Sequence, residues 1–209
     1  MIHTEKVTFR YPKGDETFNF PDIDLQSQED LLILGKSGKG KTTLLHLLAG
    51  LLQPVSGKIQ IENTVLSDLS TSAMDAFRGR QIGLVFQKNY AVQSLSLFQN
   101  LKARLFFSKT SNTDESINDL LEELGLLELK DRKTNTLSVG QLQRLGIAMA
   151  VVHGPKVILA DEPTSSLDDE NCQVVIDLLK KQAAKNKSNL IVITHDQRVK
   201  PFFQKSIIL

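Results

Sequence analysis

The chain has 209 residues, of which 41% are hydrophobic and 23% are charged, and its formal net charge at pH 7 is +1. This length suits one α/β domain with a sizeable core and room for an inserted subdomain. The near-neutral charge provides no global basic field, so we expect no nucleic acid partner. A single cysteine, Cys172, excludes disulfides within the chain and favours a reducing compartment.

No segment of the sequence predicts export or membrane insertion. Residues 1–5 are polar and predict no secretory signal peptide. The longest apolar stretch, residues 44–52, falls far short of the roughly 20 residues that a membrane-spanning helix needs. We therefore expect a protein that is soluble by itself, which leaves room for a membrane partner. Four lysines at the end of a predicted helix are expected to be solvated rather than to bind nucleic acid. They are Lys180, Lys181, Lys185 and Lys187.

The first 86 residues alternate between strand patterns and short helices. Residues 2–11 alternate apolar with polar side chains and are rich in Val, Thr and Phe, which predicts a strand. A turn at 12–15 leads to a second strand region, 17–25, which Pro21 interrupts; together they indicate an antiparallel β subdomain. The other expected elements are a strand at 31–35, a helix at 41–52, a strand at 57–62, a helix at 73–80 and a buried strand at 82–86.

The chain changes character after residue 88, where helical patterns replace strands. Helices are expected at 97–107, from an N-cap at Thr113 to Leu124 with Gly125 as the stop, and at 137–152. Beyond them we expect a buried strand at 157–160, a helix at 169–185, and strands at 190–194 and 206–209. The pattern predicts an α/β fold of mostly parallel strands that an all-helical insert divides. Residues 1–88 and 151–209 would form the core with its β subdomain, and residues 89–150 the insert.

Residues 35–42 carry the most informative local pattern. Gly35, Lys36, Ser37, Gly38, Lys39, Gly40, Lys41 and Thr42, followed by Thr43, have the spacing G-x-x-x-x-G-K-[ST] of a phosphate-binding loop. The loop follows a predicted strand and opens a predicted helix, so backbone N–H groups and the helix N-terminus can face an anion. Lys41 would reach the β- and γ-phosphates of a nucleotide, and the Thr42 hydroxyl would ligate Mg²⁺.

Two adjacent carboxylates follow the buried strand at 157–160. Asp161 and Glu162 would be costly at that position unless a ligand compensated them, and ligands bind at this edge of a parallel sheet. We expect Asp161 to hold the magnesium shell and Glu162 to polarise a water molecule for attack on a γ-phosphate. The alternative is a pair of solvent-facing acids at the end of a strand.

Several short segments together resemble one protein family. Residues 137–141 read LSVGQ and look like the signature of ABC-transporter ATPases, which is usually LSGGQ. Residues 161–164, DEPT, resemble the end of that family's Walker B strand, and residues 166–168, SLD, resemble its D-loop. Gln87 and His195 resemble its Q-loop glutamine and switch histidine. Because these segments occur in family order over nearly the whole chain, the chain resembles an ABC-transporter nucleotide-binding subunit with a P-loop NTPase core. It is most similar to the lipoprotein-release, macrolide-efflux and cell-division types.

The resemblance implies a site that two copies of the chain share. Ser138, Gly140 and Gln141, at the start of a helix, would serve the nucleotide of the partner copy in a head-to-tail dimer that holds two ATP molecules. By itself, Ser138 would be an ordinary N-cap. Val139 departs from the usual glycine. Because a β-branched residue disfavours positive φ, either this position has an ordinary φ or the signature loop is altered.

The resemblance assigns roles to two further strand-end residues. Gln87 would touch Mg²⁺ or the water molecule and move with the insert, or it would be an ordinary polar residue at a strand end. His195 would donate a hydrogen bond to the γ-phosphate and orient Glu162 and the water. The three other histidines are expected to be structural; they are His3, His46 and His153.

Two more assignments have plain alternatives. Asp168 would lie at the dimer interface, or it would only cap the following helix. Tyr11 would stack on adenine as the family's A-loop aromatic does, or it would be a core aromatic beside Phe9. Stacking gives weak base specificity, so GTP could replace ATP.

The expected function is to bind and hydrolyse ATP for a membrane transporter. The cofactors would be ATP and Mg²⁺, and the partners a second copy of the chain and an integral membrane permease. The permease would hold this cytoplasmic subunit at the inner face of the cell membrane. An apolar cluster could line the groove that receives a short permease helix, or it could be the core of the insert. Its members are Tyr90, Val92, Leu95, Leu97 and Phe98.

Three other functions compete with this one. A DNA-repair or chromosome-structural ATPase would carry coiled coils or zinc modules, for which the short span from Gln87 to Ser138 shows no heptads or cysteine pairs. A small P-loop kinase or GTPase would not explain the signature or His195. An ATPase of the cell-division type, which moves a membrane partner without transport, shares the same chemistry and stays an alternative.

Overall fold

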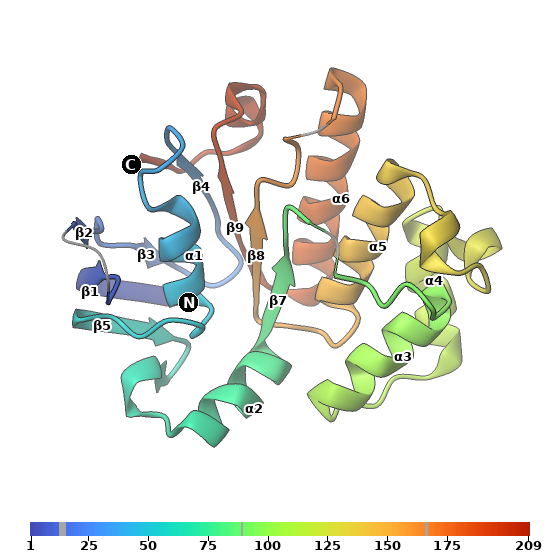
Figure 1. Cartoon of the computed structure of the whole chain (residues 1–209), viewed down its shortest axis with the longest axis horizontal. Helices are drawn as coiled ribbons and strands as arrows, with labels where there is room; N and C mark the ends of the chain where they lie inside the picture. Colours follow the sequence, from blue (N-terminus) through green and yellow to red (C-terminus); the bar gives the residue numbers. More distant parts are fainter. Residues whose placement is uncertain (13–15, 89, 166) are drawn as a thin grey trace.

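The protein consists of two β-sheets with flanking helices. The computed structural model describes residues 1–12, 16–88, 90–165 and 167–209. Most of the expected turn at 12–15, the first residue of the expected insert, Asn89, and Ser166 of the D-loop-like segment therefore lie outside the described residues. Figure 1 shows the parallel sheet in the middle, with the antiparallel sheet and helix α1 (Lys41–Leu48) on one side of it and the longer helices on the other.

The antiparallel sheet is built from the N-terminal part of the chain. Its order is β2 (Thr17–Asn19), β1 (Ile2–Arg10), β5 (Ser56–Ile61) and β6 (Thr64–Val65), and β3 (Asp24–Leu25) also pairs with β1. All of these pairings are antiparallel. The predicted antiparallel β subdomain is thus confirmed. The sequence did not predict β6, because two residues are too few to show a period.

The parallel sheet places four chemically important loops at one edge. Its order is β10 (Ser206–Ile208), β4 (Asp30–Leu34), β9 (Asn189–Thr194), β8 (Val157–Asp161) and β7 (Ile82–Val85), and every pairing is parallel. Because parallel strands end at the same edge, the residues that follow β4, β7, β8 and β9 come together there. The predicted mostly parallel sheet is confirmed.

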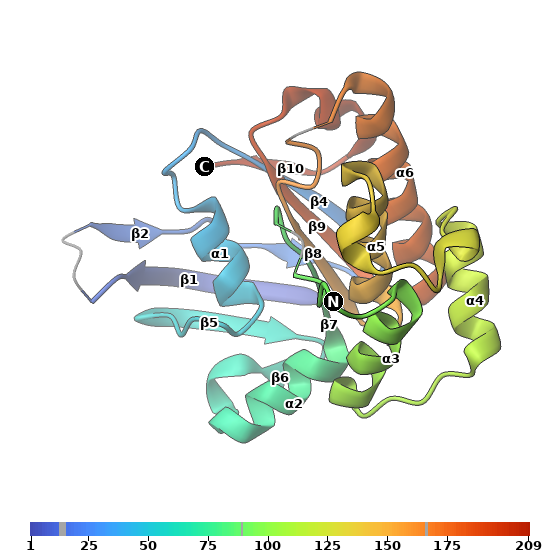
Figure 2. The same cartoon turned by 45° about the vertical axis from the view of Figure 1, so that its right-hand side comes forward.

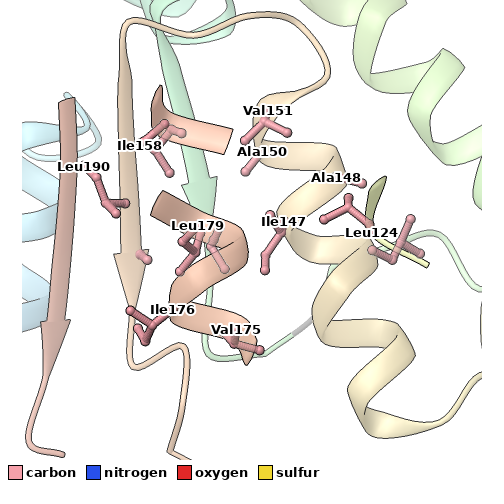
Figure 3. Packing of buried hydrophobic residues seen from close by; sticks show 14 of the residues in the cluster. Leu124, Ile147, Ala148, Ala150, Val151, Ile158, Val175, Ile176, Leu179 and Leu190 are labelled. Atoms are coloured by element: carbon pink, nitrogen blue, oxygen red, sulfur yellow. The ribbon is translucent and has the colours of Figure 1, made fainter. Parts of the chain in front are cut away.

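Alternate residues of the parallel strands belong to two hydrophobic cores. Leu31, Ile33 and Ile191 pack with α1 and the antiparallel sheet. On the opposite face, Leu190 and Ile158 pack with helices α5 (Val139–Val151) and α6 (Asp169–Asn186), as Figure 3 shows. Strands that are apolar on both faces read as continuous hydrophobic runs, which is why the sequence predicts them well.

The chain between β7 and β8 is helical, as expected. It contains α3 (Leu97–Ser108), α4 (Asp114–Glu123) and α5, which lie beside the sheet in Figure 2; α2 (Thr71–Gln81) precedes β7. The Thr113 side chain caps α4 by accepting from the Ser116 N–H, and Gly125 beyond the helix has φ +64°. Short 3₁₀ helices occur at Leu66–Asp68, Leu127–Leu129, Thr134–Thr136 and Gln197–Phe202.

Two further details also differ from the sequence prediction. Helix α1 ends at Leu48 rather than at residue 52, because Gly50 takes a left-handed conformation with φ +63°. Two of the four clustered lysines are not simply solvated: Lys180 pairs with Asp30, and Lys185 pairs with Glu123. None of the helices in the described ranges is both long and apolar enough to span a bilayer.

Candidate active site

The loop between β4 and α1 has the backbone shape of an anion cradle. Gly38 and Gly40 have φ values of +83° and +84°, and Gly40 is the N-cap of α1. A Cβ on Gly40 would lie 2.7 Å from Phe18 Cδ1, so both the conformation and the space require glycine there. Among the described residues no side chain caps α1, so its first N–H groups are directed into the loop, where an anion can accept from them.

The loop lines a cavity of about 1010 Å³. Residues 35–43 form one wall, and Gln87, Glu162 and His195 reach it from the ends of three neighbouring strands. The cavity therefore gathers most of the residues expected to bind and hydrolyse a nucleotide in one copy of the chain, although Tyr11 and Asp161 are not among its lining residues. Phe18 also lines it, which the sequence analysis did not foresee.

Lys41 is held inside the loop by hydrogen bonds to its backbone. Its Nζ donates to the carbonyl oxygens of Gly35, at 2.8 Å, and Lys36, at 3.1 Å. The same Nζ lies 3.5 Å from Glu162 Oε1, and both side chains are largely buried, with 7% and 12% exposed. The two oppositely charged residues expected to act on the γ-phosphate thus contact each other.

Glu162 is fixed through one of its two carboxylate oxygens. Oε2 accepts from Thr194 Oγ1 at 2.8 Å, from the His195 N–H at 3.3 Å and from His195 Nδ1 at 2.9 Å. Burial raises the pKa of Glu162, but the hydrogen bonds from His195 and Thr194 outweigh burial and hold this pKa below its ordinary value. The carboxylate is therefore ionised, with Oε1 directed toward Lys41.

The contact with Glu162 determines which ring nitrogen of His195 carries a proton. An ionised carboxylate only accepts, so Nδ1 of His195 carries a proton. If Nε2 is to donate to a phosphate as well, the imidazole must be protonated on both nitrogens. The ring is 61% exposed, so this second nitrogen is accessible from the cavity.

Asp161 and Thr42 provide the part of the site that fits a metal ion. Thr42 Oγ1 donates to Asp161 Oδ2 at 3.0 Å, while the buried Oδ1 has no hydrogen-bond partner among the described residues. Burial raises the pKa of Asp161. An unpaired buried carboxylate oxygen beside a hydroxyl matches the preference of Mg²⁺, which binds through one or two protein oxygens together with phosphates and water. A cage of three or more His, Cys, Asp or Glu side chains does not occur in the described ranges.

The structure places two other predicted residues near this centre. The exposed Gln87 side chain lines the cavity, and its Nε2 donates to Ser165 Oγ at 3.4 Å. Tyr11 lies beside the loop: its hydroxyl hydrogen-bonds Thr43 Oγ1 at 2.9 Å, and its ring, 43% exposed, packs edge-on against Phe9. Tyr11 thus fits both interpretations. Its ring is partly exposed, as stacking on adenine requires, and it also packs against an aromatic neighbour, as a core residue would.

The signature-like residues do not line the cavity of their own chain. Ser138 caps α5 and forms a capping box with Gln141, with reciprocal hydrogen bonds of 3.3 and 2.9 Å. Val139 lies in the first turn of α5 with an ordinary φ. Of the two possibilities for this β-branched residue, the ordinary backbone conformation is therefore the one that occurs. It is 67% exposed, and a Cβ on Gly140 would meet nothing within 4 Å. The start of α5 is therefore an open surface.

Asp168 serves as the N-cap of α6. Its Oδ1 accepts from the Asn171 N–H at 2.8 Å, as the plainer alternative expected. Of the remaining histidines, His3 is exposed beside Asp24, and His153 is buried against Arg104. Burial and the neighbouring Arg104 charge lower the pKa of His153 to about 3, so its ring is neutral.

The sequence analysis missed Thr194, although a signal was present. Thr194 is a fully buried hydroxyl at the end of an otherwise apolar strand, next to His195, and it donates to Glu162. A polar residue at that position of a buried strand needs a partner, and the nearest available group is the carboxylate at the end of the adjacent strand.

The fold and the site define a P-loop NTPase with an ATP-binding-cassette arrangement. A family model described as "ABC transporter" matches residues 18–165, more than half of the chain. The chain belongs to the ABC transporter ATP-binding family.

Relatives match over the full length of the chain. The chain is 33% identical to the lipoprotein-releasing system ATP-binding protein LolD of Legionella pneumophila (strain Lens), covering 100% of this chain and 94% of that protein. It is 34% identical to the uncharacterized ABC transporter ATP-binding protein MJ0796 of Methanocaldococcus jannaschii, covering 100% of this chain and 93% of that protein. A dimeric post-hydrolysis structure of MJ0796 bound to ADP and Pi superposes with a TM-score of 0.88 at 31% identity, over 100% of this chain and 94% of that one.

Proposed function

We propose that the chain binds and hydrolyses ATP and that two copies close around two ATP molecules to drive a membrane transporter. The observation that carries this proposal is the convergence of the loop 35–43 with Gln87, Glu162 and His195 in one cavity. Similarity to LolD proteins favours a complex of the lipoprotein-releasing type. The cell-division type of complex remains the second candidate, because its ATPase chemistry would be the same.

Nucleotide binding would use the loop and would change the partner of Lys41. The triphosphate would accept from loop N–H groups of Gly35, Lys36, Ser37, Gly38, Lys39, Gly40 and Thr43, with the base near Tyr11. Lys41 would exchange its carbonyl contacts and Glu162 for the β- and γ-phosphates. Its release would leave Glu162 Oε1 free to accept from a water molecule.

Hydrolysis would then depend on a water molecule held by Glu162. The three hydrogen bonds to Oε2 fix the carboxylate, so that Oε1 can orient the water in line with the γ-phosphate. His195, with Nδ1 on Glu162, would donate from Nε2 to the γ-phosphate. Thr42, Asp161 and Gln87 would hold Mg²⁺ together with phosphate oxygens. When bound, Mg²⁺ would neutralise charge on the phosphates.

Dimer closure would complete each site with residues of the other copy. Ser138, Gly140 and Gln141 would present the open N-terminus of α5 to the partner's γ-phosphate. Asp168 would cap α6 and face the partner as well. The dimeric MJ0796 structures support a dimer of two copies, and ATP would drive closure because it gains contacts only in the closed state.

A second cavity would receive the membrane subunit. Its volume is about 370 Å³, and Phe86, Tyr90, Phe107 and Met149 contribute apolar lining. The apolar cluster at residues 90–98 was expected either to line this groove or to form the core of the insert. Tyr90 lines this cavity, whereas Leu97 is fully buried in the core. The cavity lies beside Gln87, which follows β7, so residues 89–150 would move with the permease relative to residues 1–88 and 151–209. Binding there would hold the chain at the inner face of the membrane.

The test uses Glu162→Gln, which preserves the size of the side chain and removes its charge. We expect this variant to bind ATP, to hydrolyse it at least about 100-fold more slowly, and to elute as a dimer with ATP and Mg²⁺ during size-exclusion chromatography. The double variant that also carries Lys41→Ala is the control and should stay monomeric. A Glu162→Gln protein that remains monomeric at high protein and ATP concentration would refute the sandwich.

A further inference from the structure

One arginine that the proposed chemistry does not use links two loops of the site. Arg198 lies in the 3₁₀ helix Gln197–Phe202, shortly after His195. Its Nε donates to Asp196 Oδ1 at 2.9 Å, and its Nη2 donates to Asp196 Oδ2 at 2.8 Å. This paired geometry on one carboxylate is specific to the guanidinium group.

The same guanidinium reaches the segment that precedes α6. Nη1 of Arg198 donates to Asp169 Oδ1 at 2.5 Å, and Nη2 donates to the carbonyl oxygen of Leu167 at 3.2 Å. Leu167 and Asp169 are the two neighbours of Asp168 in the chain. Arg198 therefore fixes the backbone on one side of Asp168 and the side chain on the other.

Asp196 continues the link to the catalytic carboxylate. Its Oδ2 accepts from Thr164 Oγ1 at 2.9 Å, and its N–H donates to Thr194 Oγ1 at 3.0 Å. Thr194 Oγ1 in turn donates to Glu162 Oε2 at 2.8 Å. The hydrogen bonds from Arg198 outweigh burial and hold the pKa of Asp196 at about 2, so the carboxylate stays charged. An unbroken chain of polar contacts thus runs from Leu167 to Glu162.

We propose that Arg198 is a positioning residue for hydrolysis, which holds residues 167–169 and the loop after β9 as one unit. The inference rests on the proposed function, in which Asp168 faces the partner copy and Glu162 orients the water. Glu162 would then be held in the correct position only when residues 167–169, which face the partner copy, are also in place. Its own contribution would be to kcat, because Arg198 is not among the residues that line the nucleotide cavity.

A purely structural role for Arg198 predicts a different result. In that case activity would follow folding stability, and lysine would restore both. Lysine can pair with Asp196, but its single ammonium cannot reproduce the paired contact and also reach Leu167 and Asp169. Arg198→Lys therefore separates the two roles, since it keeps the charge and loses the geometry.

The experiment compares Arg198→Gln and Arg198→Lys with the unmodified protein. We measure kcat and KM for ATP, the affinity of the monomer for a fluorescent ATP analogue, and the urea midpoint of unfolding. We expect kcat to fall about 10- to 100-fold in both variants, with nucleotide affinity within about twofold and the urea midpoint largely kept in Arg198→Lys. A kcat within about twofold in Arg198→Gln, or full recovery of kcat in Arg198→Lys, would overturn the inference.

A gentler pair of variants covers the case in which Arg198→Gln does not fold. Asp169→Asn removes the negative charge that pairs with Arg198, at a side chain that is 90% exposed, and leaves the Asp196 pair intact. Glu170→Gln is the control, because it removes the same charge from the same first turn of α6. We expect kcat to fall about threefold or more in Asp169→Asn only. Equal kcat values in the two variants would contradict the inference.

The outcomes also separate this inference from the proposed function. If Glu162→Gln fails to dimerise with ATP, the proposed function itself is wrong. If Glu162→Gln dimerises and Arg198→Gln hydrolyses ATP at the normal rate, only the role of Arg198 is wrong.

Discussion

Replacing Asp161 by asparagine should make the nucleotide-free protein more stable while it removes the response to Mg²⁺. In the structure, Asp161 is buried, Oδ2 has one hydroxyl donor and Oδ1 has no partner among the described residues. Leaving a buried polar atom unpaired costs about 1–3 kcal/mol. Asp161→Asn removes the buried charge at nearly constant volume and still leaves one amide atom unpaired, so the free energy of unfolding should rise by only about 1 kcal/mol at pH 7.

The size of this effect depends on pH. Burial raises the pKa of Asp161 above its ordinary value of 3.8, so the folded state disfavours the ionised form. The penalty is absent where the carboxyl is protonated, appears as pH rises through the folded pKa, and is complete at neutral pH. The stability difference between Asp161→Asn and the unmodified protein should therefore shrink toward zero at about pH 3.5.

Urea unfolding without nucleotide at both pH values tests whether Asp161→Asn is more stable. Thermal unfolding with ATP tests whether the variant has lost its response to Mg²⁺. At an ATP concentration of about 100 times the dissociation constant, Mg²⁺–ATP should stabilise the unmodified protein by about 2.7 kcal/mol. In Asp161→Asn, ATP with Mg²⁺ and ATP with EDTA should stabilise equally. The reasoning is refuted if Asp161→Asn is less stable at pH 7, or if the difference is the same at both pH values.

Three substitutions test other parts of the structure. Thr194→Val should lower the free energy of unfolding by about 2 kcal/mol, because Glu162 loses a donor and the part-buried N–H of Asp196 loses its acceptor. The pKa of Glu162 is lowered in the folded state, so the loss of stability in Thr194→Val should be complete above pH 4.5 and shrink as pH falls through the folded pKa. Equal losses in urea unfolding at low and neutral pH would contradict this expectation. Gly40→Ala should lose about 1 kcal/mol or more and bind ATP more weakly by calorimetry, because φ is +84° and the new Cβ meets Phe18. Gly140→Ala, in a helix with open space around it, should instead stabilise the protein by about 0.5–1 kcal/mol, and a loss in thermal unfolding would be inconsistent with that position.

The elements that carry the site could be predicted from the sequence because each has a strong local pattern. The strand before Gly35 and those before Asp161 and His195 are apolar runs, and parallel strands of that kind end at one edge of a sheet. The predicted residues of the loop, with Glu162 and His195, therefore line one cavity.

Contacts between residues far apart in the chain could not be predicted in the same way. The pairing of Lys41 with Glu162, the approach of Phe18 to Gly40 and the contact of Tyr11 with Thr43 depend on how the antiparallel sheet packs beside α1. Local periodicity contains no information about that packing.

The apolar cluster at residues 90–98 shows a different limit of sequence reasoning. Leu97 is the first residue of α3 and is buried, whereas Tyr90, before the helix begins, is 70% exposed and lines the smaller cavity. Hydrophobicity marks both residues as apolar but does not say which of them faces solvent. Tyr90 therefore fits the interpretation as part of a groove, whereas Leu97 fits the interpretation as part of the core.

Crosslinking between two copies shows whether they share their nucleotides. In a Cys172→Ser background that also carries Glu162→Gln, one copy would contain Ser37→Cys and the other Ser138→Cys. We predict that a short bifunctional thiol reagent joins the two copies when ATP and Mg²⁺ are present and not with ADP. If no crosslink forms with ATP, or if it forms equally without nucleotide, the two copies do not share their nucleotides as the account requires.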